Sequence, residues 1–159
     1  MGPEDKKEDQ FEDVSLFNPI FSKLNQNLLD TSICGTRPAY APDQSRIVGG
    51  INALPGEFPW IGSLRVDDGS DRGRFFCGTT LITSQWVLTA AHCAGSYIDR
   101  VIFGGLRLSN ESEYEVNAEV ADIIIHPDYD AESNDKDIAL LRLTEPVSFS
   151  DYVRPAMLA

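Results

Sequence analysis

The stretch Gln85-Trp86-Val87-Leu88-Thr89-Ala90-Ala91-His92-Cys93 decides the fold of this protein and carries its most informative side chain. Residues 86–89 favour β-structure, so we expect a strand that ends just before two alanines. Small alanine side chains leave room for a bulky neighbour. His92 then stands at the end of a rigid element, where a catalytic imidazole is well supported. A structural histidine beside a buried thiol is the competing interpretation for an isolated His-Cys pair.

Short segments rich in strand-forming residues lie on both sides of this stretch. They cover residues 61–66, 75–77 with 81–82, 86–89, 101–103, 119–125 and 138–143. Turn-forming residues separate them, and no long segment shows the helical period of hydrophobic residues. About six short strands joined by turns predict an all-β protein, either a sandwich or a barrel.

The overall charge restricts the kind of partner. The 159 residues carry a formal net charge of -12. Residues 1–46 hold 8 acids and 5 bases, and residues 47–159 hold 17 and 8, so neither part forms a basic arm. This balance argues against nucleic acid and anionic membrane surfaces, which both require basic patches. No apolar run of 18 residues occurs, so no membrane-spanning segment is expected, and the charged start does not resemble a signal peptide.

The chain divides into three parts by composition. Residues 1–33 begin with a charged stretch that we expect to be disordered. Weakly periodic apolar residues from 14 to 33 then suggest a turn or short helix. Residues 34–46 contain prolines, a glycine and small polar residues, which predict an exposed linker. Residues 47–159 contain all the expected strands and are enough to bury a core.

The cysteine count is odd, with Cys34, Cys77 and Cys93. In an oxidising compartment, an odd count suggests that one cysteine has its partner in another chain or outside the printed sequence. A zinc site built from the three cysteines and His92 is the alternative. No C-x-x-C or H-x-x-H spacing supports it, so we expect no metal.

Three further stretches fall in order around the histidine: Arg46-Ile47-Val48-Gly49-Gly50, Phe76-Cys77-Gly78 and Asp137-Ile138-Ala139-Leu140-Leu141. Together with Thr89-Ala90-Ala91-His92-Cys93, they resemble the trypsin/chymotrypsin family of serine proteases over residues 34–159. The resemblance implies a closed Greek-key barrel of six strands, the first of the two barrels of a trypsin-like domain. It also implies a secreted or extracellular serine endopeptidase without a cofactor. Its expected partners are protein or peptide substrates, with protein inhibitors as further candidates.

The resemblance assigns roles to two side chains. His92 matches the general base of the family, and Asp137 matches the carboxylate that orients this base. The apolar run after Asp137 predicts that this carboxylate enters the interior, where it needs a partner such as an imidazole N–H. Asp135 is the competing carboxylate, and we expect it to be solvated because it lies outside the run.

Further positions follow from the same resemblance. Cys77 and Cys93 match the cysteines that close the loop holding the base. Arg46-Ile47 resembles the activation site, at which cleavage frees the amino group of Ile47. Asn110 begins an Asn-Glu-Ser sequence, which in a secreted protein is a candidate glycosylation site.

Some features depart from the family pattern. Met157 stands where the family has the cysteine that partners Cys34, so we expect Cys34 to be free or to have its partner in another chain or outside the printed sequence. Residues 104–107 replace the acidic start of the family's calcium loop, so we expect no calcium site. No serine lies in a Gly-Asp-Ser-Gly-Gly context, and we therefore expect the chain alone to be inactive. The alternatives are a non-catalytic half-domain that acts as a binding module or decoy, and a fragment of a longer protease.

Overall fold

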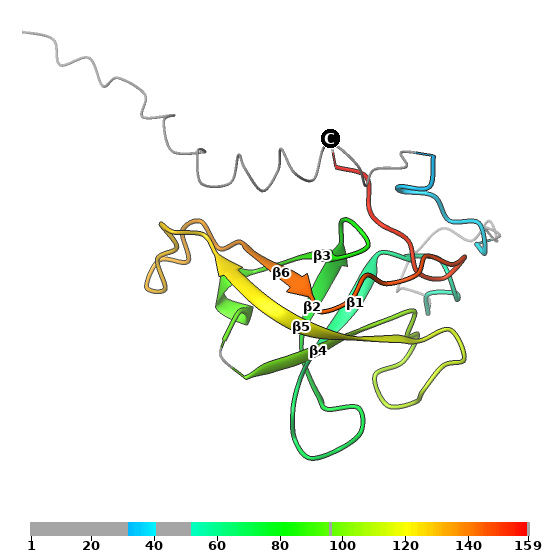
Figure 1. Ribbon diagram of the computed structural model, residues 1–159, viewed down its shortest axis with the longest axis horizontal. Coiled ribbons are helices and arrows are strands. Elements are labelled where there is room, and N and C mark those ends of the chain that lie inside the picture. Colours follow the sequence, from blue (N-terminus) through cyan, green and yellow to red (C-terminus); the bar gives the residue numbers. More distant parts are fainter. Residues whose placement is uncertain (1–31, 41–51, 96, 159) are drawn as a thin grey trace, which may run out of the picture.

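Six antiparallel strands close into a barrel in the computed structural model, which describes residues 32–40, 52–95 and 97–158 (Figure 1). The strands are β1 Ile61–Val66, β2 Arg74–Leu81, β3 Trp86–Thr89, β4 Ile98–Phe103, β5 Val116–Ile125 and β6 Ala139–Leu143. Their order around the barrel is β1-β2-β3-β6-β5-β4, and β4 pairs with β1 to close it. The expectation of an all-β barrel is confirmed, and closure leaves no strand with an unpaired edge.

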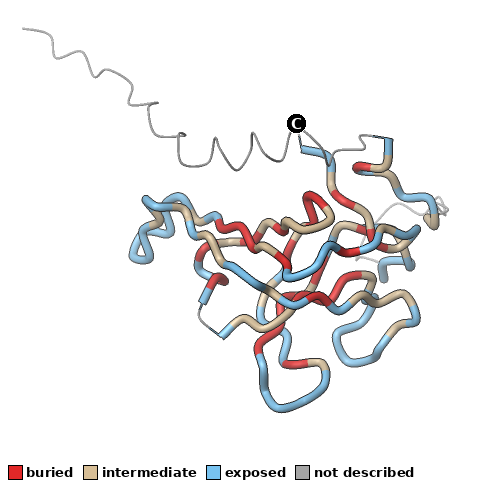
Figure 2. The backbone as a smooth tube through the Cα atoms, in the orientation of Figure 1, coloured by how far each residue is buried: buried red, intermediate tan, exposed pale blue. Residues whose placement is uncertain are grey.

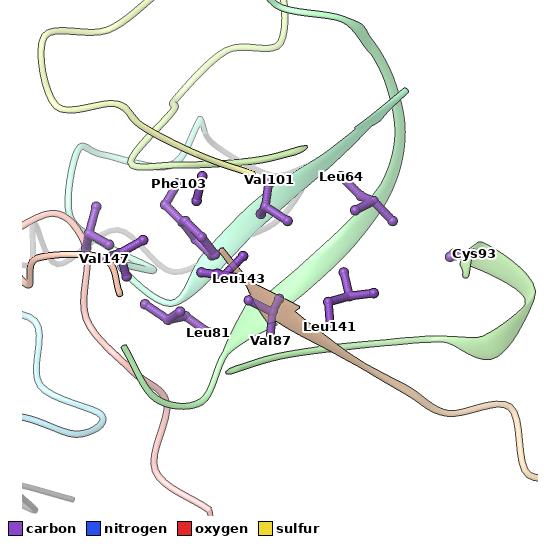
Figure 3. Packing of buried hydrophobic residues seen from close by; sticks show 11 residues of the cluster. Leu64, Leu81, Val87, Cys93, Val101, Phe103, Leu141, Leu143 and Val147 are labelled. Carbon is purple, nitrogen blue, oxygen red and sulfur yellow. The ribbon is translucent and has the colours of Figure 1, made fainter. Parts of the chain in front are cut away.

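The barrel interior is filled by aliphatic side chains and one phenylalanine (Figure 3). Leu64, Val87, Val101, Phe103 and Leu141 are all 0% exposed. They come from β1, β3, β4 and β6, so the hydrophobic faces of strands far apart in the sequence meet in one cluster. Buried residues are frequent on β1, β3, β4 and β6, whereas β2 and β5 carry more exposed residues than buried ones (Figure 2).

The strands differ from their expected bounds mainly at the ends. β4 begins at Ile98 and β5 begins at Val116, both three residues earlier than the apolar segments alone indicate. The cause is pairing with neighbouring strands: Val116 of β5 lies opposite Phe103, and Ile98 of β4 lies opposite Val66 of β1. β6 begins at Ala139, one residue later than expected.

The structure describes residues 34–40 of the linker expected over residues 34–46. Arg37 and Pro38 are exposed, but Cys34 is buried at 5% exposure, against the expectation. The segment packs beside residues 154–157 near the other end of the chain (Figure 1). The N–H of Gly35 donates to the carbonyl of Pro155 at 2.9 Å, and Arg154 Nη1 donates to Thr36 Oγ1 at 2.9 Å. Gly35 has φ of +66°, a conformation that side chains disfavour, and a Cβ there would lie 3.2 Å from Met157 Cβ.

Some of the sequence predictions fall outside the described residues. These include the activation site at Arg46-Ile47 and the periodic segment up to residue 31. Among the described residues, no helix has the length and apolar character needed to cross a membrane.

Candidate active site

Strand register brings the two predicted catalytic side chains together. β3 and β6 are antiparallel, and the last residue of β3, Thr89, lies opposite the first residue of β6, Ala139. The chain that leaves β3 therefore starts at the same edge as the chain that enters β6. His92 follows Thr89 in a short 3₁₀ turn, Ala91–Cys93, and Asp137 precedes Ala139 by two residues.

Asp137 holds His92 through two hydrogen bonds. Its Oδ1 accepts the backbone N–H of His92 at 2.8 Å, and its Oδ2 lies 2.7 Å from His92 Nδ1. Because an ionised carboxylate only accepts hydrogen bonds, the proton of the neutral imidazole belongs on Nδ1. The lone pair of Nε2 is then available to accept a proton, which is the arrangement required of a general base.

The same contacts keep Asp137 ionised. The hydrogen bond from the backbone N–H of His92 and, next, the one to its imidazole lower the pKa of Asp137 below its ordinary value, against the opposing effect of burial. Hydrogen bonds to the charged form of a carboxylate always act in this direction. At neutral pH the site therefore contains a carboxylate beside the imidazole.

The turn that carries His92 is fixed by a disulfide and by small side chains. Cys77 on β2 is bonded to Cys93, with their Cα atoms 6.1 Å apart, as the resemblance implies. Ala91 and Ala94 pack with Ala139 in a small buried cluster. The alanines thus allow the turn to approach the start of β6 closely, and the disulfide ties it to β2.

Burial of Asp137 differs from the expectation. Its side chain is 24% exposed and that of His92 is 56% exposed. Ile138 is also exposed, at 41%, so the buried part of the apolar run begins only at Ala139. Asp137 and Ile138 instead line an open hollow of about 490 Å³ beside β2 and β3. Asp135 is exposed and accepts a hydrogen bond from its neighbour Lys136, as expected for a solvated carboxylate.

The zinc alternative has a geometric basis but not the required sulfur chemistry. Ligand atoms of Cys77, His92 and Cys93 all lie within 4.8 Å of one another, and His92 Nε2 lies 3.3 Å from Cys93 Sγ. Both sulfurs belong to the disulfide, whereas zinc requires thiolates. Cys34 lies in the separate N-terminal segment and does not complete this group.

Comparison with known proteins agrees with this geometry. A family model described as "Trypsin" matches residues 47–159. The chain belongs to the trypsin family of serine proteases. It is 41% identical over 129 residues to transmembrane protease serine 9 of Rattus norvegicus, a match that covers 79% of this chain and 12% of the relative. The matched region begins at Ile47, the residue after the Arg46 of the expected activation site.

For this trypsin-family chain, sequence reasoning missed several features of the site region. The hydrogen bond from the backbone of His92 to Asp137 has no signal in residue spacing, because it depends on the shape of the turn. The pair formed by Arg72 and Glu115, at 2.6 and 3.0 Å, joins two loops that are far apart in the sequence. The ion pair with Arg72 occupies both carboxylate oxygens of Glu115. Glu115 belongs to the loop that begins at residues 104–107, where the sequence departs from the calcium loop of the family.

Proposed function

We propose that this chain provides the general base of a serine-type endopeptidase. The observation that carries the proposal is the double hydrogen bond by which Asp137 fixes both the backbone and the imidazole of His92. Hydrolysis of a peptide bond by a serine requires a base that removes the hydroxyl proton and returns it to the leaving amine. His92 fits this role because its Nε2 is free of the Asp137 contact and its ring is largely exposed.

Asp137 has a positioning role in this proposal. When His92 takes a proton, the imidazolium is stabilised by the adjacent carboxylate, whose lowered pKa keeps it ionised at neutral pH. The carboxylate also holds the imidazole in the tautomer that leaves Nε2 unprotonated before the reaction. Exposure of the His92 ring leaves it accessible to a hydroxyl group from another part of a protease.

The nucleophile and the oxyanion donors are proposed to come from residues outside the printed sequence, which contains no Gly-Asp-Ser-Gly-Gly stretch. The chain by itself should therefore neither hydrolyse a peptide amide nor react with a fluorophosphonate probe. We further propose a secreted or extracellular location, with activation by cleavage at Arg46-Ile47. Asn110, which is exposed, is the proposed glycosylation site.

The base and its orienting carboxylate can be tested in the chain as it exists. Nitrogen-15 NMR of the His92 ring should show the proton on Nδ1 in the wild type. Asp137→Asn should abolish this preference, and the matched control Asp135→Asn should retain it. Equal tautomer populations in the wild type and Asp137→Asn would contradict the positioning role.

Catalysis is tested by fusing the chain to the serine-bearing half of another trypsin-family domain. The fusion should cleave a peptide amide after its activation site is cut. Asp137→Asn should lower kcat by about 10⁴-fold, the size known for the equivalent change elsewhere in the family, while Asp135→Asn should have little effect. An active fusion in which His92→Ala keeps most of the activity would refute the proposal.

A further inference from the structure

A second hollow lies on the side of β1 and β2, next to the loop that follows β4. Its volume is about 210 Å³, and its lining includes Ser63, Arg65, Phe75, Leu106, Arg107 and Leu108. Three of these side chains, Phe75, Leu106 and Leu108, are large apolar groups that are at least 38% exposed. The hollow therefore combines an apolar rim with two arginines.

Arg65 is the unusual member of this group, because it is only 3% exposed. Its Nε donates to Ser63 Oγ at 3.1 Å, Nη1 donates to the Gly73 carbonyl at 3.3 Å, and Nη2 lies 3.5 Å from the Leu108 carbonyl. All three acceptors are neutral. Among the described residues, no carboxylate forms an ion pair with this guanidinium. Arginine is rarely buried to this degree without a paired anion.

The neighbouring acids compensate the charge of Arg65 only in part, because neither of them forms a direct ion pair with it. Glu115 also lines the hollow, but both of its carboxylate oxygens bind Arg72. Arg65, Arg72 and Glu115 together carry one excess positive charge, and Asp68 is a further acid that acts on Arg65 without forming an ion pair with it. Burial and, next, the charge of Arg72 lower the pKa of Arg65, although Glu115 and Asp68 act in the opposite direction. Arg107 adds a second cation at the rim.

We propose that this hollow binds the carboxylate of an acidic side chain from a peptide or protein partner. A guanidinium has five N–H donors, and the three hydrogen bonds of Arg65 use three of them, which leaves two for a carboxylate. The apolar rim fits a hydrophobic residue next to the acid. A sulfated polysaccharide fits less well, because the large apolar side chains of Phe75, Leu106 and Leu108 on the rim offer its sulfate and hydroxyl groups no hydrogen bonds.

The hollow lies close to the candidate active site along β2. Phe75 precedes Cys77 by two strand residues, about 7 Å at the usual rise of a strand, and Cys77 is bonded to the residue after His92. A peptide held at His92 could therefore place an acidic side chain in the hollow. This link to substrate rests on the proposed function, whereas binding of the carboxylate does not.

The test uses the whole chain and two capped dipeptides, N-acetyl-Phe-Glu-amide and its neutral counterpart N-acetyl-Phe-Gln-amide. Titration followed by NMR should show that the Glu peptide binds at least tenfold more tightly than the Gln peptide. Binding of the Glu peptide should also shift the Arg65 Nε–H signal. Arg65→Met should abolish the difference between the peptides. Arg107→Gln should weaken binding of the Glu peptide severalfold, and the matched control Arg142→Gln, on β6 and paired with Asp122, should not.

Three results would overturn the proposal. One is equal affinity for the two dipeptides, and another is no shift of the Arg65 signal up to the solubility limit of the Glu peptide. The third is a shift of that signal by a heparin tetrasaccharide but not by the Glu peptide, which would assign the hollow to sulfated glycans. If Arg65→Met does not fold, the wild-type titration and Arg107→Gln decide the question. Because none of these measurements involves hydrolysis, they remain valid if the proposed protease function fails.

Discussion

Removing the disulfide should strongly destabilise the barrel. The double variant Cys77→Ala with Cys93→Ala opens a loop whose ends are 16 residues apart in the sequence. On the chain-entropy model, opening a loop of this length costs about 3 kcal/mol of unfolding free energy, because the unfolded chain gains conformational freedom. Cys93 is also 4% exposed and belongs to the core cluster, so loss of its sulfur removes roughly 1 kcal/mol of buried contacts.

The expected total is therefore about 4 kcal/mol, a large part of the stability of a typical domain. Urea unfolding followed by tryptophan fluorescence measures it directly, because Trp86 lies inside the loop closed by the disulfide and Trp60 lies just before β1. The slope with urea should increase slightly, since an unfolded chain without the cross-link exposes more surface. Cys34→Ala, which keeps the disulfide, is the control for loss of a buried cysteine elsewhere. A decrease in unfolding free energy of less than about 1 kcal/mol would refute the reasoning that the disulfide stabilises the barrel by restricting the conformations of the unfolded chain.

Four other outcomes are expected. Leu141→Ala, in the fully buried core, should cost about 2–5 kcal/mol in urea unfolding, whereas the exposed Leu54→Ala should cost little. Because folding lowers the pKa of Asp137, its ionised carboxylate stabilises the folded state above its pKa in the unfolded chain, near pH 4. This stabilisation is lost as the pH falls through the lower pKa of the folded state. Unfolding measured at several acidic pH values should show the loss in the wild type and not in Asp137→Asn. Trypsin should cut first at Arg46-Ile47, which N-terminal sequencing of the product beginning Ile-Val-Gly-Gly would show. Expression through a secretory pathway should add a glycan that Asn110→Gln removes, as seen by mass spectrometry.

Most strands could be predicted from the sequence because their own residues favour β-structure. Residues 61–66 and 86–89 alternate or cluster strand-forming side chains between turns, and the structure has strands with these same bounds. The bounds of β4 and β5 were less predictable. Their first residues become strand through pairing with a neighbour, which a local pattern cannot contain.

The candidate site was predictable in its residues and less so in its surroundings. A motif specifies which histidine and which aspartate belong together, and the structure brings His92 and Asp137 within 2.7 Å. It does not specify exposure, because that depends on which segments cover the site. For this reason Asp137 is more exposed than the apolar run after it suggested. For the same reason the burial of Arg65 could not be predicted from its strand, in which apolar and polar residues are mixed.

The geometry of the site and the stability of the core depend on one feature, the register of β3 against β6. Val87 lies opposite Leu141 in this register, and both side chains are fully buried. A slip by one residue would turn the hydrophobic set of one strand outward, since side chains alternate between faces. The same slip would move Asp137 by about 3.3 Å along the strand direction, more than the 2.7 Å that separates it from His92 Nδ1. Core packing therefore penalises the one-residue slip that would break the pair, so the scaffold that buries Leu141 also holds the base and its carboxylate in place.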